Sequence, residues 1–507
     1  MPFDFNKRDC KLGFVCAIVM VWRFCVCAIL IKKTEKEHGY KMKRESLWLR
    51  YKDEDKKELE RVNSLYKKCL DEGKTERECV ELVVKMAEEK GYRELYAATA
   101  AGDKFAAGDK FYAVQMNKSV ALFQLGTKPV SQGMNILGAH IDSPRIDVKQ
   151  NPLYEKDGFA YFDTHYYGGI KKYQWTAVPL ALHGVVAKKD GEVVNVCIGE
   201  KDDDPVFVIT DLLVHLAGQQ MTKKASEVVT GENLDLLIGN CPLEENEELE
   251  KEEKETLKAN VLKLLKESYD IEEEDFLSAE LEIVPAGKAR DLGFDRSMVL
   301  AYGQDDRICA FTSLFAMLDL ASEVTQSTLC CLLVDKEEIG SVGATGMQSH
   351  FFENAVAELI AATEEDSQRL VRRALVGSRM LSSDVSAGYD PLYASAFEKN
   401  NAAFLAHGLT FNKFTGSRGK SGSNDANAEY IAQLRKIMDD ADVKYQFAEL
   451  GKVDVGGGGT IAYILANYGM NVIDSGVAVL NMHAPYEVSS KADVYEAVRG
   501  YTAFLRS

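Results

Sequence analysis

The hydrophobic pattern is helical from residue 44 to residue 90. Apolar residues recur there at intervals of three and four amid lysine and glutamate, as they do on the buried face of an amphipathic helix. The positions that define this face are Leu47, Leu49, Tyr51, Leu59, Val62, Leu65, Tyr66, Val80, Leu82, Val83 and Met86. The pattern therefore predicts helix over residues 44–90.

Short apolar runs bounded by turn residues follow and predict strands. Three such runs lie at 111–116, 119–125 and 135–141. From residue 296 onward, helical segments alternate with apolar runs that predict four further strands, at 328–335, 377–383, 402–406 and 472–481. This alternation is typical of an α/β domain whose mostly parallel sheet is flanked by helices.

Residues 143–295 have a different texture, with short strands and several glycines. A charged run over 244–274 contains an apolar stripe formed by Leu257, Val261, Leu262, Leu264 and Leu265. Such a stripe predicts a solvated helix rather than a disordered acidic tail. The change of texture divides the chain after the first 41 residues into three segments, 42–142, 143–295 and 296–507.

Residues 1–41 differ from the rest of the chain. Residues 12–31 are apolar except for Arg23, and twenty such residues can span a hydrocarbon layer of about 30 Å, so a membrane anchor is one interpretation. The other is that the working protein starts at Met42 and that 1–41 is a mis-assigned or dispensable leader. A secretory signal is disfavoured because no small-residue cleavage site follows the apolar core.

Composition and charge narrow the functional classes. The chain has 507 residues, of which 46% are hydrophobic, and its net charge is −18. It therefore has enough apolar side chains for a folded core, and its negative charge argues against nucleic acid, whose phosphates require clustered lysine and arginine. The seven cysteines after residue 41 lack the spacing of a disulfide framework. A cytoplasmic location is expected, with membrane attachment through 12–31 as the alternative.

Five short motifs rich in carboxylates and histidine lie at or beside predicted strand ends. They are GAHIDSP at 138–144, QDDR at 304–307, DKEEIGS at 335–341, SSDV at 382–385 and NMHA at 481–484. The carboxyl ends of parallel strands meet at one edge of a sheet, so these side chains are expected to converge. Imidazole and carboxylate without cysteine form the donor set of an open Zn²⁺, Mn²⁺ or Co²⁺ site.

Each motif alone has a plainer interpretation. A histidine at a strand end commonly bonds a backbone carbonyl, and Glu337-Glu338 could begin a solvated helix. Asp305-Asp306-Arg307 could cap a helix and form a surface ion pair. The metal-site hypothesis depends on the presence of all five motifs in this order.

Together, the five motifs resemble the aspartyl-aminopeptidase family of dizinc metallopeptidases, and the resemblance covers residues 42–507. It implies a zinc exopeptidase-like catalytic domain formed by 42–142 and 296–507. A smaller β-rich domain, 143–295, would be inserted into it for dimerisation and for covering neighbouring sites. The implied assembly is a homo-dodecamer built from dimers, and the implied reaction removes single N-terminal residues from peptide substrates.

The resemblance also implies a role for each site residue. Five ligands would hold two Zn²⁺ per subunit, with Mn²⁺ or Co²⁺ as substitutes, in two sets that share Asp305: His140, Asp305 and Asp384, and Asp305, Glu338 and His483. Glu337 would be the general base that takes a proton from the attacking water. Asp142 would orient His140 by accepting the second ring N–H.

Two positions depart from the family's pattern near the substrate. Members that select acidic N-terminal residues carry a histidine three residues after the ligand Asp384, where this chain has Ala387, and another where it has Asp211. An acid in the pocket would repel an acidic substrate, so a neutral N-terminal residue is the alternative expectation. His215 either matches a neighbouring family histidine or is a core histidine on a helix.

Overall fold

The computed structural model describes residues 45–243 and 255–507, of which 46–507 group into one unit. The predicted leader, 1–41 with its apolar stretch 12–31, lies outside the described residues, as does 244–254 within the acidic run. None of the helices in the described ranges combines the length and apolar character that a membrane crossing needs.

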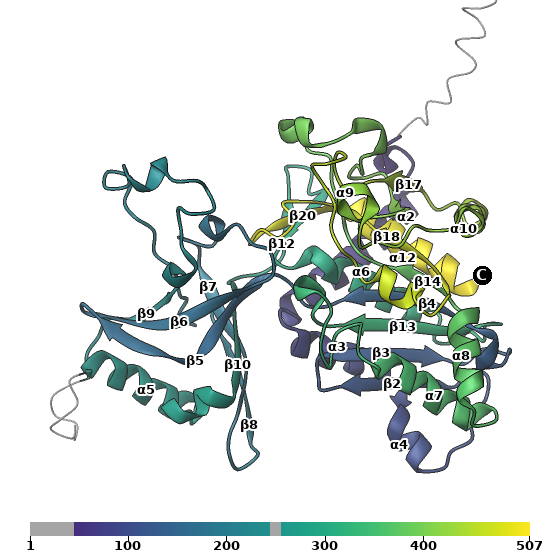
Figure 1. The fold of residues 1–507 in the computed structure, drawn as a ribbon, viewed down its shortest axis with the longest axis horizontal. Coiled ribbons are helices and arrows are strands. Elements are labelled where there is room, and N and C mark those ends of the chain that lie inside the picture. The colour runs from purple at the N-terminus through teal and green to yellow at the C-terminus, as the bar shows by residue number, and fades with distance from the viewer. Residues whose placement is uncertain (1–44, 244–254) are drawn as a thin grey trace, which may run out of the picture. The chain divides into compact units, whose positions relative to one another are not determined.

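The fold is a mixed α/β structure whose largest described sheet has nine strands in the order β1-β2-β3-β13-β4-β14-β18-β16-β17 (Figure 1). Their bounds are β1 Arg93–Glu94, β2 Lys110–Gln115, β3 Ser119–Gln124, β4 Met134–His140, β13 Thr328–Val334, β14 Arg379–Ser382, β16 Leu409–Asn412, β17 Tyr445–Ala448 and β18 Asn471–Gly476. The four central strands β13, β4, β14 and β18 are parallel. Strands β3 and β16 join this group antiparallel, so the carboxyl ends of the four central strands share one edge.

Helices cover both faces of the nine-stranded sheet. Alternate residues of β13 enter two different cores, Leu329, Cys331 and Leu333 one of them and Cys330 and Leu332 the other. The first core includes α2 Asp53–Glu72, α3 Glu76–Glu88, α6 Gln304–Asp319, α10 Ala428–Asp440 and α12 Lys491–Arg506. The second includes α4 Leu95–Ala100, α7 Phe351–Thr363, α8 Gln368–Gly377 and α11 Ala462–Ala466. Burial on both faces explains why the central strands are continuous apolar runs in the sequence.

A second sheet of six antiparallel strands, in the order β8-β7-β10-β5-β6-β9, is formed by residues between 145 and 285. Its strands are β5 Arg145–Lys156, β6 Phe159–Tyr167, β7 Leu180–Ala187, β8 Val193–Ile198, β9 Leu236–Gly239 and β10 Ala279–Pro285. The helix predicted within the acidic run is α5, Thr256–Tyr269, and Val261, Leu262 and Leu265 of its apolar stripe pack on the core of this sheet.

A third sheet connects segments that are far apart in the sequence. Its five strands, in order, are β11 Arg290–Leu292, β12 Met298–Ala301, β20 Glu487–Ser490, β19 Ala478–Leu480 and β15 Ser386–Ala387. Strand β12 pairs with β20, which immediately precedes α12, so this small sheet brings the start of α6 close to residues 481–490.

Three predicted elements differ from the structure. The helix predicted over 44–90 is interrupted, because Gly73 ends α2 and Thr75 begins α3 with a capping box to Glu78. The strand predicted at 402–406 is wrong, since only Ala403 forms a bridge there, to Gly388.

The run 472–481 is two strands rather than one. It leaves the nine-stranded sheet at Gly476 and continues as β19 in the third sheet. A side chain at Gly476 would collide with the backbone carbonyl of Asp384, because an added Cβ would lie 2.0 Å from that oxygen. Glycine at this position therefore lets the chain pass close to the segment after β14 where it changes sheets.

Candidate metal centre

The predicted site residues follow adjacent strand ends of the nine-stranded sheet. His140 is the last residue of β4, Asp384 follows β14 by two residues, and Glu337 and Glu338 form the short 3₁₀ turn after β13. Because these three strands are parallel neighbours, their carboxyl ends lie side by side.

Two further predicted ligands come from outside this sheet edge. Asp305 lies in the first turn of α6, and His483 lies in the loop between β19 and β20. The carboxylate of Asp305 stands between two imidazoles, with Oδ1 3.4 Å from His140 Nε2 and Oδ2 3.3 Å from His483 Nε2. Each oxygen of the Asp305 carboxylate therefore faces a different histidine.

The remaining acids surround this axis. Glu338 Oε2 is 3.6 Å from His483 Nε2, and Glu337 Oε2 is 3.9 Å from His140 Nε2. Donor atoms of His140, Asp305 and Glu338 all lie within 4.8 Å of one another, as do those of His140, Asp306 and Asp384. The structure thus brings all the predicted ligands together around the two histidines.

The residues present fit metal ions on two grounds. Glu338 Oε1 and Asp306 Oδ1 are buried and have no hydrogen-bond partner among the described residues, a costly state that a cation would relieve. Burial and the neighbouring charge of Asp305 raise the pKa of Glu338 well above its usual value, and burial with Asp306 does the same for Asp384. Without cations these carboxyls would hold protons, and metal ions replace such protons.

Both histidine rings are oriented by their second nitrogen. His140 Nδ1 lies 3.0 Å from the backbone oxygen of Asp142 and 3.2 Å from its Oδ1, and His483 Nδ1 lies 2.8 Å from the backbone oxygen of Gly169. A donated Nδ1–H leaves Nε2 of each ring free as a metal ligand. Gly169 belongs to the segment that follows β6 of the six-stranded sheet. A residue from outside the nine-stranded sheet therefore orients a predicted ligand.

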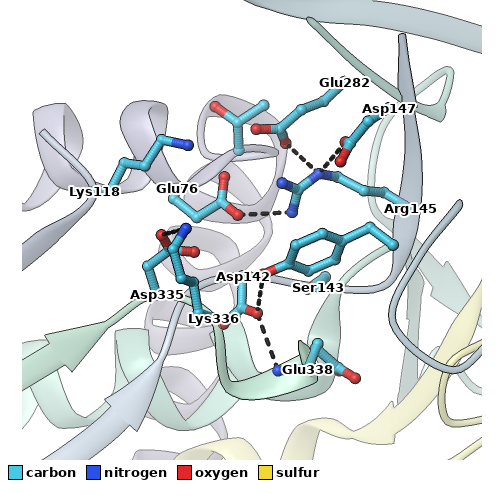
Figure 2. Close-up of polar contacts among 12 residues, drawn as sticks. Glu76, Lys118, Asp142, Ser143, Arg145, Asp147, Glu282, Asp335, Lys336 and Glu338 are labelled. Carbon is cyan, nitrogen blue, oxygen red and sulfur yellow. Dashed lines mark hydrogen bonds and ion pairs between the residues drawn. The ribbon is translucent and has the colours of Figure 1, made fainter. Parts of the chain in front are cut away.

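Asp142 organises more than the His140 ring. Its Oδ1 accepts the backbone N–H of Glu337 at 3.1 Å. Its Oδ2 accepts that of Glu338, also at 3.1 Å (Figure 2). Tyr167 donates its hydroxyl hydrogen to Oδ2 at 2.9 Å. The carboxylate therefore fixes the backbone of both predicted glutamates as well as the imidazole.

Three functional residues were not predicted. Glu487, buried in β20, accepts the backbone N–H of Asp305 at 2.9 Å and that of His483 at 2.8 Å, and so connects two predicted ligands. A carboxylate oxygen of Asp306 lies within 4.8 Å of donor atoms of His140 and Asp384. The third, Tyr167, gives no sequence signal, whereas Glu487 could have been suspected from its place four residues after His483.

The surface ion pair considered for Asp305-Asp306-Arg307 is wrong. Asp306 and Arg307 are both buried, and Arg307 donates to the backbone oxygen of Lys74 at 2.7 Å. Its guanidinium also lies 5.3 Å from the centre of the Tyr302 ring, a cation–π contact, while its buried Nε has no hydrogen-bond partner among the described residues.

A cavity of about 540 Å³ adjoins the His483 side of the centre. Ala387, Leu480, Met482 and Phe397 supply apolar lining, and Lys171 is one of its charged residues. Asp211 lines a different cavity, where it accepts a hydrogen bond from Gln220, and therefore does not face this one within the single chain. The interpretation of His215 as a core histidine on a helix is wrong, since it is exposed in a turn.

A scan against protein-family models matches residues 69–505 to the family described as aminopeptidase I zinc metalloprotease (M18). The chain belongs to the M18 family of zinc aminopeptidases. It is 58% identical over 460 residues to a probable M18 family aminopeptidase 1 of Clostridium acetobutylicum, covering 91% of this chain and 97% of that protein.

Solved structures of M18 proteins have the same fold. The crystal structure of aminopeptidase I from C. acetobutylicum matches with a TM-score of 0.85 at 55% identity, covering 92% of this chain and 99% of that one. The mApe1 dodecamer of S. cerevisiae matches with a TM-score of 0.69 at 19% identity, covering 87% and 95%, and at that identity the likeness concerns the fold alone. Membership of M18 confirms the resemblance seen in the motifs and the predicted enzyme class, a metal-dependent aminopeptidase.

Proposed function

We propose that this M18 enzyme is a dizinc aminopeptidase that removes one N-terminal residue at a time from short peptides. The observation that carries the proposal is the Asp305 carboxylate, whose two oxygens face His140 and His483 separately. A carboxylate placed in this way would be shared by the two zinc ions. The remaining ligands are Asp384 with His140, and Glu338 with His483.

The residues of these two sets would hold zinc ions, which when bound would supply Lewis-acid activation of water and a binding point for the free α-amine of the peptide. The protein's own groups supply the rest of the reaction. The Glu337 carboxylate takes a proton from the attacking water and delivers it to the departing amine. Burial raises the pKa of Glu337 to about 7, which suits a group that must accept and then release a proton near neutral pH.

Asp142 supports this chemistry by positioning. Its carboxylate accepts the backbone N–H groups of Glu337 and Glu338, so the base and one ligand are held in a fixed relation to the His140 ring. Misplacement of reacting groups by as little as about 1 Å can cost a hundredfold in rate. Asp142 therefore acts through Glu337, Glu338 and His140 rather than on the peptide itself.

The substrate is a peptide with a neutral N-terminal residue. The side chains of Ala387, Leu480, Met482 and Phe397 give the cavity beside His483 an apolar lining that suits such a residue. Lys171 in the same cavity favours the second candidate, an acidic N-terminal residue. Relative kcat/KM for a panel of aminoacyl substrates distinguishes the two, because Lys171→Met would reduce only the rates for acidic residues.

Residues 42–142 and 296–507 form the catalytic domain, and 143–295 form an inserted domain for self-association in the reducing cytoplasm. The separate sheet and core of residues 145–285 support this division. A run of exposed apolar side chains in this segment supports a subunit contact: Leu212, Leu213, Val214, Leu216 and Met221. A homo-dodecamer is the proposed assembly, and light scattering of the purified protein tests it.

The test of the dizinc centre is its metal content after loss of the bridge. Asp305→Asn should lower bound zinc by about two equivalents per chain relative to the unsubstituted protein, because both ligand sets share this residue. Asp295→Asn, on the exposed turn before β12, is the matched control and should retain all the zinc. A loss of one equivalent or none in Asp305→Asn would contradict the bridging arrangement.

A further inference from the structure

A second cluster of metal-type donors lies where α3 meets the six-stranded sheet. It consists of Glu78 on α3, His183 on β7 and Cys197 on β8, and their donor atoms lie within 4.8 Å of one another. His183 and Cys197 are direct cross-strand partners, so the pairing of the two strands holds them together. The cluster shares no residue with the centre around Asp305.

The donors of this cluster are oriented by other contacts. Glu78 Oε2 caps α3 by accepting the backbone N–H of Lys74 and Thr75, which leaves Oε1 facing His183 Nδ1 at 2.7 Å. On the far side of the ring, His183 Nε2 lies 3.2 Å from Glu200 Oε1. Glu200 in turn forms an ion pair with the buried Lys74 ammonium, with Oε1 2.5 Å from Nζ.

This arrangement matches the usual surroundings of a metal-bound histidine. A ring that donates one N–H to a carboxylate presents its other nitrogen to a metal, and here Glu200 takes the N–H while Nδ1 faces Glu78. Thiolate, imidazole and carboxylate are all zinc ligands. Cys197 is exposed whereas His183 is buried, so the cluster can be reached from solvent on the cysteine side.

We propose that Glu78, His183 and Cys197 form an additional metal site that takes Zn²⁺ or another thiophilic transition-metal ion. It joins α3, which packs beside the nine-stranded sheet, to β7 and β8 of the six-stranded sheet. A bound ion would therefore tie together two parts of the chain that otherwise meet there through hydrogen bonds and ion pairs.

The charges of the cluster allow a metal ion to bind. Burial lowers the pKa of His183, but hydrogen bonds with Cys197, Glu200 and Glu78 raise it to about 11, so the ring is an imidazolium when no metal is present. A divalent ion would displace one proton from this ring and one from the Cys197 thiol. The two charges of the metal ion would replace those of the two displaced protons. Metal binding would therefore leave the net charge of the largely buried site unchanged.

Cobalt distinguishes this site from the catalytic centre, because a thiolate bound to Co²⁺ gives a near-ultraviolet charge-transfer band and the catalytic donors include no sulfur. The metal-free full-length chain is titrated with Co²⁺ while absorbance is recorded. We expect a saturable band of about one equivalent per chain in the unsubstituted protein and in Cys241→Ser, the matched control at another exposed cysteine.

Cys197→Ser should lose the band and keep its aminopeptidase activity, which shows that the variant is folded. Absence of the band from the unsubstituted chain would overturn the proposal in favour of a simple imidazolium ion pair. Persistence of the band in Cys197→Ser would overturn it by assigning the thiolate elsewhere.

Discussion

The hydroxyl of Tyr167 donates a hydrogen bond to Asp142 Oδ2 at 2.9 Å, and this contact joins the six-stranded sheet to the metal centre. The Arg145 guanidinium lies 3.9 Å from the centre of the Tyr167 ring. Arg145 is itself held by the carboxylates of Glu76 at 2.7 Å and Glu282 at 3.1 Å (Figure 2). The orientation of Asp142 therefore depends on a buried ion network outside the sheet edge that carries the ligands.

Tyr167→Phe should lower kcat by about 10-fold or more with little change in KM, because loss of a group that orients metal ligands typically costs about 10–100-fold. The phenylalanine ring keeps its contact with Arg145, so the melting temperature should change little. Chelator competition should show weaker zinc binding. Tyr166→Phe, its exposed neighbour on β6, is the control, and equal kinetics in the two variants would contradict the role of the hydroxyl.

Glu337→Gln should lose about 10²–10⁴-fold in kcat, the range expected when a general base is removed. Glutamine has the same shape and keeps its backbone N–H bonded to Asp142, so zinc content should remain unchanged. Steady-state kinetics and elemental analysis of one preparation check both points. Activity close to that of the unsubstituted enzyme would assign the proton transfer to another group.

Glu487→Gln should weaken zinc binding and lower the stability of the fold. The substitution places an amide NH₂ against the backbone N–H of either Asp305 or His483, and it removes one of the two backbone hydrogen bonds that the Glu487 carboxyl accepts, worth about 0.5–1.5 kcal/mol. Thermal unfolding and chelator competition measure the two effects. Glu429→Gln, at an exposed position of α10, should change neither, and an equal response of the two variants would rule out a specific role for Glu487.

The buried carboxyl of Asp474 should make the free energy of unfolding depend on pH. It is buried in β18, neither of its carboxylate oxygens has a hydrogen-bond partner among the described residues, and burial raises its pKa from 3.8 to about 7. Between these two values the folded chain holds a proton that the unfolded chain has lost. The free energy of unfolding therefore falls by about 1.4 kcal/mol per pH unit as pH rises through this window.

Asp474→Asn stays neutral and should lack this contribution, so its stability relative to the unsubstituted protein should increase from pH 5 to pH 7. Denaturant unfolding of both proteins at several pH values measures the difference. A constant difference across this range would show that Asp474 ionises in the folded chain as it does in the unfolded one.

The sequence allowed the convergence of the predicted ligands to be foreseen because its signal is local. His140, Glu338 and Asp384 follow apolar runs that form neighbouring parallel strands, and the topology brings such strand ends together. The roles of Tyr167 and Glu487 could not be read in this way. Tyr167 contacts Asp142 from a different sheet, and Glu487 connects the β19–β20 loop to the start of α6. Residue type alone does not reveal such contacts.

The incorrect strand predictions have a related cause. An apolar run indicates that a segment is buried but not the sheet to which it belongs. The run 472–481 therefore predicts one strand although it contributes to two sheets. Likewise, the run at 402–406 is partly buried beside Gly388 without pairing as a strand. Asp211 was placed near the substrate by analogy, and the structure puts it in a separate cavity of the chain.

The acceptor that orients the His483 ring is the backbone carbonyl of Gly169, and Tyr167 lies two residues before it. Neither belongs to the segments that supply the five predicted ligands. A shortened chain without residues 143–295 would retain every predicted ligand and the base, yet one ring would lose the partner of its Nδ1 and Asp142 would lose its tyrosine. The nine-stranded sheet alone thus lacks two contacts that orient the site. Moving only the ligand-bearing segments into another protein would leave these contacts behind.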